Sequence, residues 1–269
     1  MEAGGSRWLG RLYLIVMFIF LYVPIAYLIV YSFNAGGQMH HFSGFTLDWY
    51  RELFSDTRLL IIVLNTVIIA LLSSAVATAI GTIGAIGLFF LMQRRVRESL
   101  ITLNNVLIVN PDVVIGASFL ILFTVLGIQL GFISVLIAHI AFSIPIVVLM
   151  VLPKLYEMPK TLIDAATDLG APPRQVLTRV IIPFITPGMM AGFFMALTYS
   201  LDDFAVTFFV TGSGFSTLSV EIYSRARHGI SLSINALSTI LFGVTMLLVF
   251  GYYWISQRGL RRVALWVKR

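Results

Sequence analysis

The sequence predicts an all-α integral membrane protein with six transmembrane helices, and two observations carry this prediction. First, 59% of the 269 residues are hydrophobic and 11% are charged, whereas about 25% of residues are charged in ordinary soluble domains. Second, runs of roughly 20 mainly apolar residues recur along the chain, and each is long enough to cross a hydrocarbon core as a helix. Backbone groups in lipid must be satisfied within the segment, so these runs are expected to be helices.

Six apolar runs between polar breaks give the predicted spans. They are Leu12 to Phe33, Leu60 to Met92, Leu100 to Leu126, Phe132 to Leu152, Pro183 to Val210 and Ile234 to Ser256. We expect residues 1–269 to form a single transmembrane domain. No internal duplication is evident, so a two-fold symmetric pore would need a second subunit. The absence of cysteine excludes disulfides and cysteine metal sites.

The placement of basic residues predicts the orientation. If the N-terminus is cytoplasmic, only four of the 18 Lys and Arg residues fall in outer segments, namely Arg51, Arg58, Arg225 and Arg227. Such a bias predicts that both termini are cytoplasmic. The net charge of +6 is then explained by topology rather than by a nucleic-acid partner.

The sequence also predicts how the first span and the outer loop after it relate to the membrane. Arg7 and Arg11 precede the first apolar run as in a secretory signal, but the run is too long and no small-residue cleavage site follows before Asn34, so we expect an uncleaved anchor. Aromatic and charged residues are mixed between Asn34 and Leu59, which predicts a short amphipathic helix at the membrane interface.

Polar residues interrupt the third and fourth spans. Asp112 follows Pro111 about 12 residues into its span, near the midplane, where an aspartate costs about 2.5 to 3.5 kcal/mol. We expect it to face a water-filled path, a basic partner or a structural polar contact, and we expect Pro111 to kink the helix. His139 in the fourth span is interpreted as a satisfied packing residue rather than a ligand or proton relay.

The longest cytoplasmic interruption runs from Pro153 to Ile182. Its apolar and polar residues alternate at helical spacing around Asp164, which predicts an amphipathic helix of about two to three turns. Gly170 suits a left-handed C-terminal cap, and Pro172 and Pro173 prevent the helix from continuing. A second short helix is expected from Arg174 to Pro183, where the fifth span begins.

This interruption resembles the EAA loop of binding-protein-dependent ABC permeases, written E-A-A, three residues, Gly, nine residues, I-x-L-P. The spacing is intact, and the matching residues are Asp164, Ala165, Ala166, Gly170, Val180, Ile182 and Pro183, three of them conservative substitutions. The resemblance implies that this loop, residues 153–182, docks as a coupling helix on a cytoplasmic ATPase. The expected coupling residues are Asp164, Ala165, Ala166, Asp168 and Gly170.

Nearly the whole chain is similar to the spermidine/putrescine permease subfamily, and more to its C-type than to its B-type subunit. The similarity rests on the segments YVPIAYLIVYSFN from Tyr22, PDVVIGASFLILFTVLGIQLGF from Pro111, SLDDFAVTFFVTG from Ser200 and INALSTIL from Ile234. It implies a type I ABC importer permease of MetI-like fold in a bacterial inner membrane. Implied partners are a second permease subunit, two ATPase subunits and an extracytoplasmic solute-binding protein.

The chain itself has no Gly-x-x-x-x-Gly-Lys-Ser/Thr loop, so we expect ATP and Mg²⁺ on the partner ATPase and no cofactor or metal bound directly. Spermidine and putrescine are not separated by the sequence, and related permeases carry ferric iron or other small solutes. Two further classes stay open. One is an intramembrane enzyme, for which Ser143 beside His139 is the sole candidate pair, and the other is a standalone channel or secondary carrier.

Acidic side chains are the expected substrate-path residues, because a polyamine is cationic. Asp202 and Asp203 lie near the outer end of the fifth span, and since adjacent helical positions diverge by about 100°, one of them, Asp203 by preference, is expected to face the path. The alternative for this pair is headgroup solvation or a helix cap. The full expected set is Asp112, Asp202, Asp203, Glu221 and Tyr223, with receptor docking as the alternative for the last two.

Overall fold

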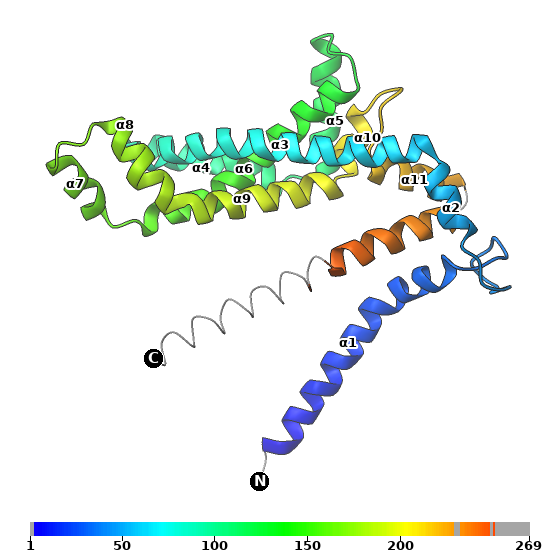
Figure 1. Ribbon diagram of the computed structural model, residues 1–269. Coiled ribbons are helices and arrows are strands. Elements are labelled where there is room, and N and C mark those ends of the chain that lie inside the picture. The colour runs from blue at the N-terminus through cyan, green and yellow to red at the C-terminus, as the bar shows by residue number, and fades with distance from the viewer. Residues whose placement is uncertain (1–2, 229–231, 248–249, 251–269) are drawn as a thin grey trace. The chain divides into compact units, whose positions relative to one another are not determined.

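The computed structural model describes residues 3–228, 232–247 and 250, with side chains for residues 8–227, 232–247 and 250. Its elements within those ranges are helices, apart from one isolated bridge between Asn34 and Phe45 (Figure 1). The chain divides into two compact units, Met1–Leu59 with Ser224–Arg269, and Leu60–Tyr223. The expectation of one domain over residues 1–269 stays a prediction.

The first unit opens with α1, Ala3–Tyr31, whose described side chains are largely exposed. Asn34 organises the loop that follows, since its buried amide nitrogen donates to the carbonyls of Gln38 and His41. The indole of Trp49 in turn donates to the Asn34 carbonyl at 2.8 Å. These bonds lead into α2, Asp48–Ser55. The short amphipathic helix predicted between Asn34 and Leu59 is therefore confirmed, and its place at the membrane interface stays a prediction.

Asp56 joins three parts of the first unit. It caps the start of α3, Thr57–Phe90, by accepting the Leu59 N–H at 3.0 Å. It also accepts from the Arg225 guanidinium at 3.0 Å, near the end of α11, Leu218–His228. The Leu59 N–H and, after it, the Arg225 contact hold the pKa of the Asp56 carboxyl below its ordinary value.

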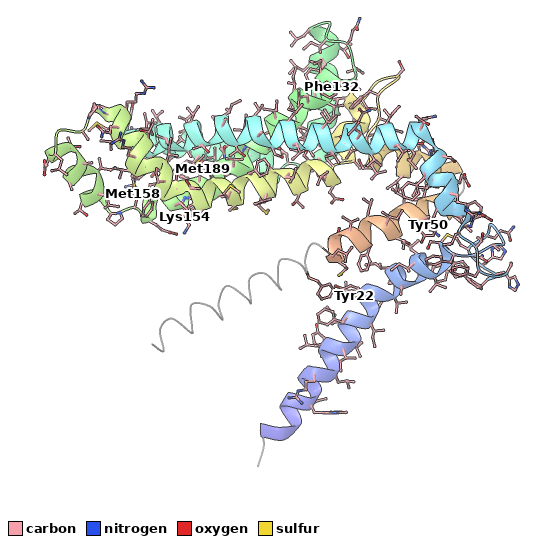
Figure 2. All side chains as sticks on the ribbon, viewed as in Figure 1. Tyr22, Tyr50, Phe132, Lys154, Met158 and Met189 are labelled. Carbon is pink, nitrogen blue, oxygen red and sulfur yellow. The ribbon has the colours of Figure 1, made fainter. Side chains whose placement is uncertain are left out.

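The second unit is built on α3, α6 (Phe132–Glu157) and α9 (Ile182–Asp202), which run alongside one another in Figure 1. Small residues permit the close approach. A side chain at Gly81 would come within 2.8 Å of Val147, and one at Gly192 within 3.2 Å of the Val147 backbone. The apolar core between these helices extends to Met158, which lies buried just after α6 (Figure 2).

The third predicted span is not one helix. Leu100 to Leu126 divides into α4, Arg94–Val109, and α5, Asp112–Val125, with a bend of 103° between them. Pro111 has extended geometry, ψ 133°, and cannot donate a backbone hydrogen bond. The prediction of one continuous helix is thus wrong, and the expected kink at Pro111 is a full break within the pair that together passes as one bent span.

The bounds of the fifth span were also wrong. Helical backbone runs unbroken from Pro173 through α8 (Pro173–Val176) and a π turn (Leu177–Ile181) into α9, so Pro183 does not begin the helix. The wider π turn accommodates the missing N–H of Pro183. At the other end α9 stops at Asp202, and Ala205–Val210 forms a separate helix, α10.

Among the described residues, four helices are long and apolar enough to cross a membrane: Trp8–Tyr31, Thr57–Phe90, Phe132–Glu157 and Pro173–Asp202. A fifth is obtained if α4 and α5 count as one bent span, and a shorter apolar helix covers Leu232–Leu247. The sixth predicted span, Ile234 to Ser256, continues past residue 250, outside the described residues. The all-α membrane fold class is confirmed.

Candidate functional site

The two helix breaks lie together in the second unit. α5 and α10 pack against each other so closely that a side chain at Gly116 would come within 3.0 Å of the Val206 backbone. Asp112 is the first residue of α5, and Asp203 lies two residues before the first residue of α10, Ala205. Asp112 and Asp203 therefore stand at helix starts rather than in helix interiors, whereas Asp202 is the last residue of α9.

Asp203 acts as the cap of α10. Its side chain is buried, 8% exposed, and Oδ2 accepts from the Thr207 N–H at 2.8 Å and from the Thr207 hydroxyl at 2.7 Å. Oδ1 accepts from the Val206 N–H at 3.3 Å. These contacts favour the helix-cap alternative for Asp203. Asp202 is the exposed member of the pair, and which of the two faces the path stays a prediction.

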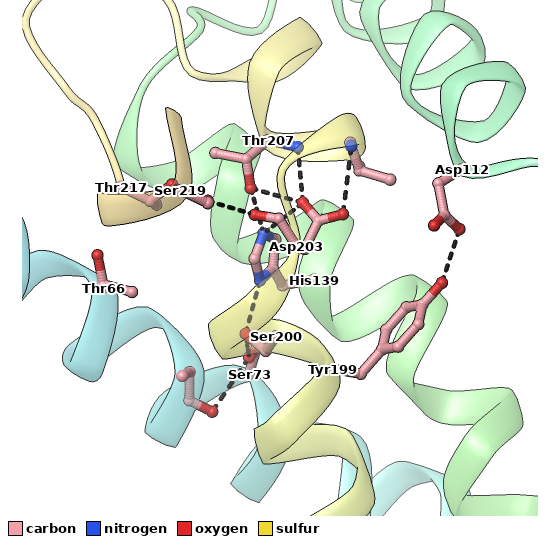
Figure 3. A network of polar contacts seen from close by, with 12 residues as sticks. Thr66, Ser73, Asp112, His139, Tyr199, Ser200, Asp203, Thr207, Thr217 and Ser219 are labelled. Carbon is pink, nitrogen blue, oxygen red and sulfur yellow. Dashed lines mark hydrogen bonds and ion pairs between the residues drawn. The ribbon is translucent and has the colours of Figure 1, made fainter. Parts of the chain in front are cut away.

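His139 lies fully buried at the centre of a polar network (Figure 3). The Thr207 hydroxyl gives its proton to Asp203, so it can only accept from His139 Nε2, 2.8 Å away. His139 Nδ1 then accepts from the Ser200 hydroxyl at 2.6 Å, and Ser200 also contacts Ser73 of α3 at 3.1 Å. The interpretation of His139 as a satisfied packing residue is confirmed.

The network also fixes the residues around it. The Ser219 hydroxyl, on α11, donates to the Asp203 carbonyl at 2.6 Å.

Ser143, the candidate nucleophile beside His139, has no hydrogen-bond partner for its hydroxyl among the described residues. Since both ring nitrogens of His139 are engaged by Ser200 and Thr207, the dyad that an intramembrane enzyme would need is not formed.

Asp112 is held by a residue that the sequence did not single out. The hydroxyl of Tyr199, in the last turn of α9, donates to Asp112 Oδ1 at 2.6 Å (Figure 3). The two residues are 87 positions apart, and a tyrosine in an apolar run has no sequence signal that points to such a partner. Both side chains are partly exposed.

Glu221 and Tyr223 lie on α11. Glu221 is buried, and its backbone N–H donates to the Thr217 carbonyl at 3.0 Å. The Tyr223 ring packs against Phe204 and Phe208, at centroid distances of 4.5 Å and 5.9 Å. Tyr223 thus forms part of an aromatic cluster beside α10, and both residues stay predicted path residues.

A second candidate site lies at the opposite end of this unit, where Figure 1 shows α7, Lys160–Asp168, and α8. α7 ends as predicted. Gly170 has φ +79°, its N–H donates to the Thr167 carbonyl at 2.9 Å, and the Ala171 N–H donates to the Ala166 carbonyl at 3.0 Å. This is a Schellman cap, which fixes the angle at which the chain leaves α7. The surface excursion is shorter than residues 153–182, because α6 continues through Pro153 to Glu157.

The two alanines of the motif face different surroundings. Ala166, with Ile163, packs against the apolar core of the unit. Ala165 is exposed, together with Asp164 and Asp168. Large apolar side chains also reach the surface here, since Leu162 is 42% exposed and Leu169 is 88% exposed. α7 therefore presents an outer face of small and apolar residues flanked by carboxylates.

Comparison with known proteins shows the family of the chain. The family described as "Binding-protein-dependent transport system inner membrane component" matches residues 77–262. The spermidine/putrescine transport system permease protein PotC of Escherichia coli K12 is 36% identical over 253 residues, covering 93% of this chain and 96% of PotC. The putrescine transport system permease protein PotI of the same organism is 32% identical, covering 91% of this chain and 90% of PotI.

Solved structures show the same fold at lower identity. A bacterial ABC transporter involved in the import of the acidic polysaccharide alginate has a chain with a TM-score of 0.73 and 17% identity, covering 94% of this chain and 96% of that one. A chain of the MetNI methionine ABC transporter in an inward-facing conformation has a TM-score of 0.60 and 18% identity, with coverage of 74% and 95%.

Proposed function

The chain belongs to the family of binding-protein-dependent transport system inner membrane components, and from that premise we propose that it is a permease subunit of an ATP-driven importer of polyamines. It is a multi-pass membrane protein. The observation that carries the substrate class is the identity of 36% over 93% of the chain to a spermidine/putrescine permease. Like its relatives, it is a transport subunit and not an enzyme.

The charges of the described helix breaks support a cationic substrate. Asp112 stands at the start of α5, partly exposed, and Asp202 ends α9, exposed. Carboxylates at membrane depth are costly against lipid and are tolerated where they face a water-filled path or a polar partner surface. At about 4 Å, one carboxylate attracts an ammonium group by on the order of 4 kcal/mol at an effective dielectric near 20, which permits both recognition and release.

The proposed assembly contains two permease subunits, two ATPase subunits and an extracytoplasmic solute-binding protein, with both termini of this chain in the cytoplasm. ATP and Mg²⁺ are bound by the ATPase subunits. The outer face of α7, with Ala165 at its centre, docks on the ATPase, and closure of the ATPase pair moves α7 and opens the path outward. Exposed Leu162 and Leu169 give this surface apolar area to bury in a partner groove.

Reconstitution with the partner subunits tests the function. The complex is placed in liposomes, and uptake of labelled spermidine, putrescine and ferric iron is measured with the receptor and ATP present or omitted. We expect polyamine uptake that needs both. Uptake of iron alone would support an ATP-driven importer and overturn the polyamine as its substrate. Uptake of polyamine without ATP or ATPase would identify a secondary carrier and overturn the proposal.

A further inference from the structure

The Asp112 carboxylate has one oxygen engaged and one available. Tyr199 donates to Oδ1 at 2.6 Å, and the structure gives the Asp112 side chain no other hydrogen bond among the described residues. Because a phenol has a single proton, Tyr199 Oη has no further hydrogen to give and can only accept from a ligand. The pair therefore offers two acceptors, Asp112 Oδ2 and Tyr199 Oη.

These two acceptors are adjacent. Oδ2 shares its carbon with Oδ1, and Oδ1 is 2.6 Å from Oη. One nitrogen atom can therefore reach both at ordinary hydrogen-bond distances. Tyr199 is 38% exposed and Asp112 is partly exposed, so a ligand can approach them.

Contacts with α6 fix the position of the Tyr199 ring. Phe142 of α6 meets it edge-on, with centroids 5.1 Å apart and planes at 79°, and Phe142 itself packs on the His139 ring at 4.9 Å. Ser200, the next residue on α9, is anchored to His139 at 2.6 Å and to Ser73 at 3.1 Å. The buried network thus sets the last turn of α9, and with it the phenol that holds Asp112.

We propose that Tyr199 is a specificity-determining residue, which together with Asp112 recognises a primary ammonium group by accepting two of its N–H bonds. This inference rests on the proposed function, since it assigns one amine of the transported polyamine to Asp112 and Tyr199. A primary ammonium has three donors and fills both acceptors. A dimethylated ammonium has one donor, so it leaves one acceptor unmet while keeping the same charge. Sites built on paired hydrogen bonds reject analogues that lack a donor more strongly than charge alone allows.

Competition between two diamines tests the proposal. The reconstituted transporter with its receptor takes up labelled putrescine or N,N,N′,N′-tetramethylputrescine, each supplied at the concentration that loads the receptor equally. The same receptor serves every variant, so its own preference cancels. Tyr199→Phe keeps the ring and its contact with Phe142 and removes the hydroxyl. We expect the preference for putrescine to fall by about 3- to 10-fold, with Tyr13→Phe on the exposed face of α1 leaving it unchanged.

A double variant supplies a second measurement that does not depend on the methylated diamine. If Tyr199 acts through the shared ammonium, Tyr199→Phe slows putrescine uptake in the native background and has no further effect in the Asp112→Asn background. The role of Tyr199 would be overturned if Tyr199→Phe keeps the native preference for putrescine and the two substitutions slow uptake additively in the double variant. If Asp112→Asn alone is defective in that case, the proposed function still stands. Normal polyamine transport by Asp112→Asn would instead remove the path residue on which both depend.

Discussion

The two ends of the second unit differ in how their structure arises. At the α7 end, a helix, a left-handed glycine and two prolines follow one another within a few residues, and the contacts are local. At the end where α5 and α10 begin, the contacts join distant residues, since His139 and Ser200 are 61 positions apart and Asp112 and Tyr199 are 87 positions apart. The local end presents an exposed face of small and apolar residues, whereas the distant contacts hold carboxylates in place. The proposed coupling face and the proposed recognition residues thus lie at opposite ends of the same three long helices.

The largest effect is expected at the local end. Ala165→Arg should abolish transport, because a long charged side chain on the exposed face of α7 would overpack the proposed close contact with the ATPase. The residue is exposed, so insertion and folding of this chain should be normal. Copurification of the ATPase measures the loss directly.

The matched control for this variant is Gln93→Arg, which adds the same side chain at an exposed position just before α4. It should retain both ATPase association and transport. Normal association of the Ala165→Arg chain would exclude α7 from the docking surface.

The next effect is expected in the buried network. His139→Ala leaves a cavity and removes the partner of two buried hydroxyls, Ser200 and Thr207, and should lower the free energy of unfolding by roughly 2 to 5 kcal/mol. Thermal unfolding in detergent, followed by size-exclusion chromatography, gives the shift. His40→Ala, at an exposed loop position, is the control. Equal melting of the native and His139→Ala chains would mean that the network does not hold α10.

How far the sequence predicted these features follows from the same contrast. The Gly170 cap and the α7 helix were predictable because glycine and proline act on their own neighbours. The EAA spacing then pointed to a coupling role, which stays a prediction. The break at Pro111 was only half predicted, since a proline signals a kink but not a bend of 103°. The cap formed by Asp203 was one of the alternatives open for that pair, because an acidic residue before a helix can cap it locally. Tyr199 was not predictable, because its bond to Asp112 depends on which helices pack together.

A smaller effect on stability is expected at Gly170, where comparison with a second glycine separates backbone strain from packing. Gly170 has φ +79°, with open space where a side chain would begin, so Gly170→Ala should cost about 1 kcal/mol through strain alone. Gly87, inside α3, also has open space but needs no positive φ. Gly87→Ala should therefore be neutral or slightly stabilising, and equal destabilisation by both substitutions in a thermal-unfolding assay would refute the role of the cap.

The smallest effect concerns pH and lies in the first unit. Because the folded state lowers the pKa of Asp56, its contribution is present above the ordinary carboxyl pKa and is lost as the pH falls through the folded value. The Arg225 pair is partly exposed, so we expect less than about 1 kcal/mol. Unfolding measured between pH 7 and pH 3 should show less acid destabilisation in Asp56→Asn than in the native chain, and identical profiles would contradict this.

The separation of coupling from recognition is tested most directly by measuring ATP hydrolysis and putrescine uptake on the same reconstituted vesicles for the native chain, Asp112→Asn and Ala165→Arg. We predict that Asp112→Asn retains receptor-stimulated ATP hydrolysis and loses most uptake, while Ala165→Arg loses both. If Asp112→Asn transports putrescine at the native rate, or if Ala165→Arg retains coupled uptake, the account of the two ends is wrong.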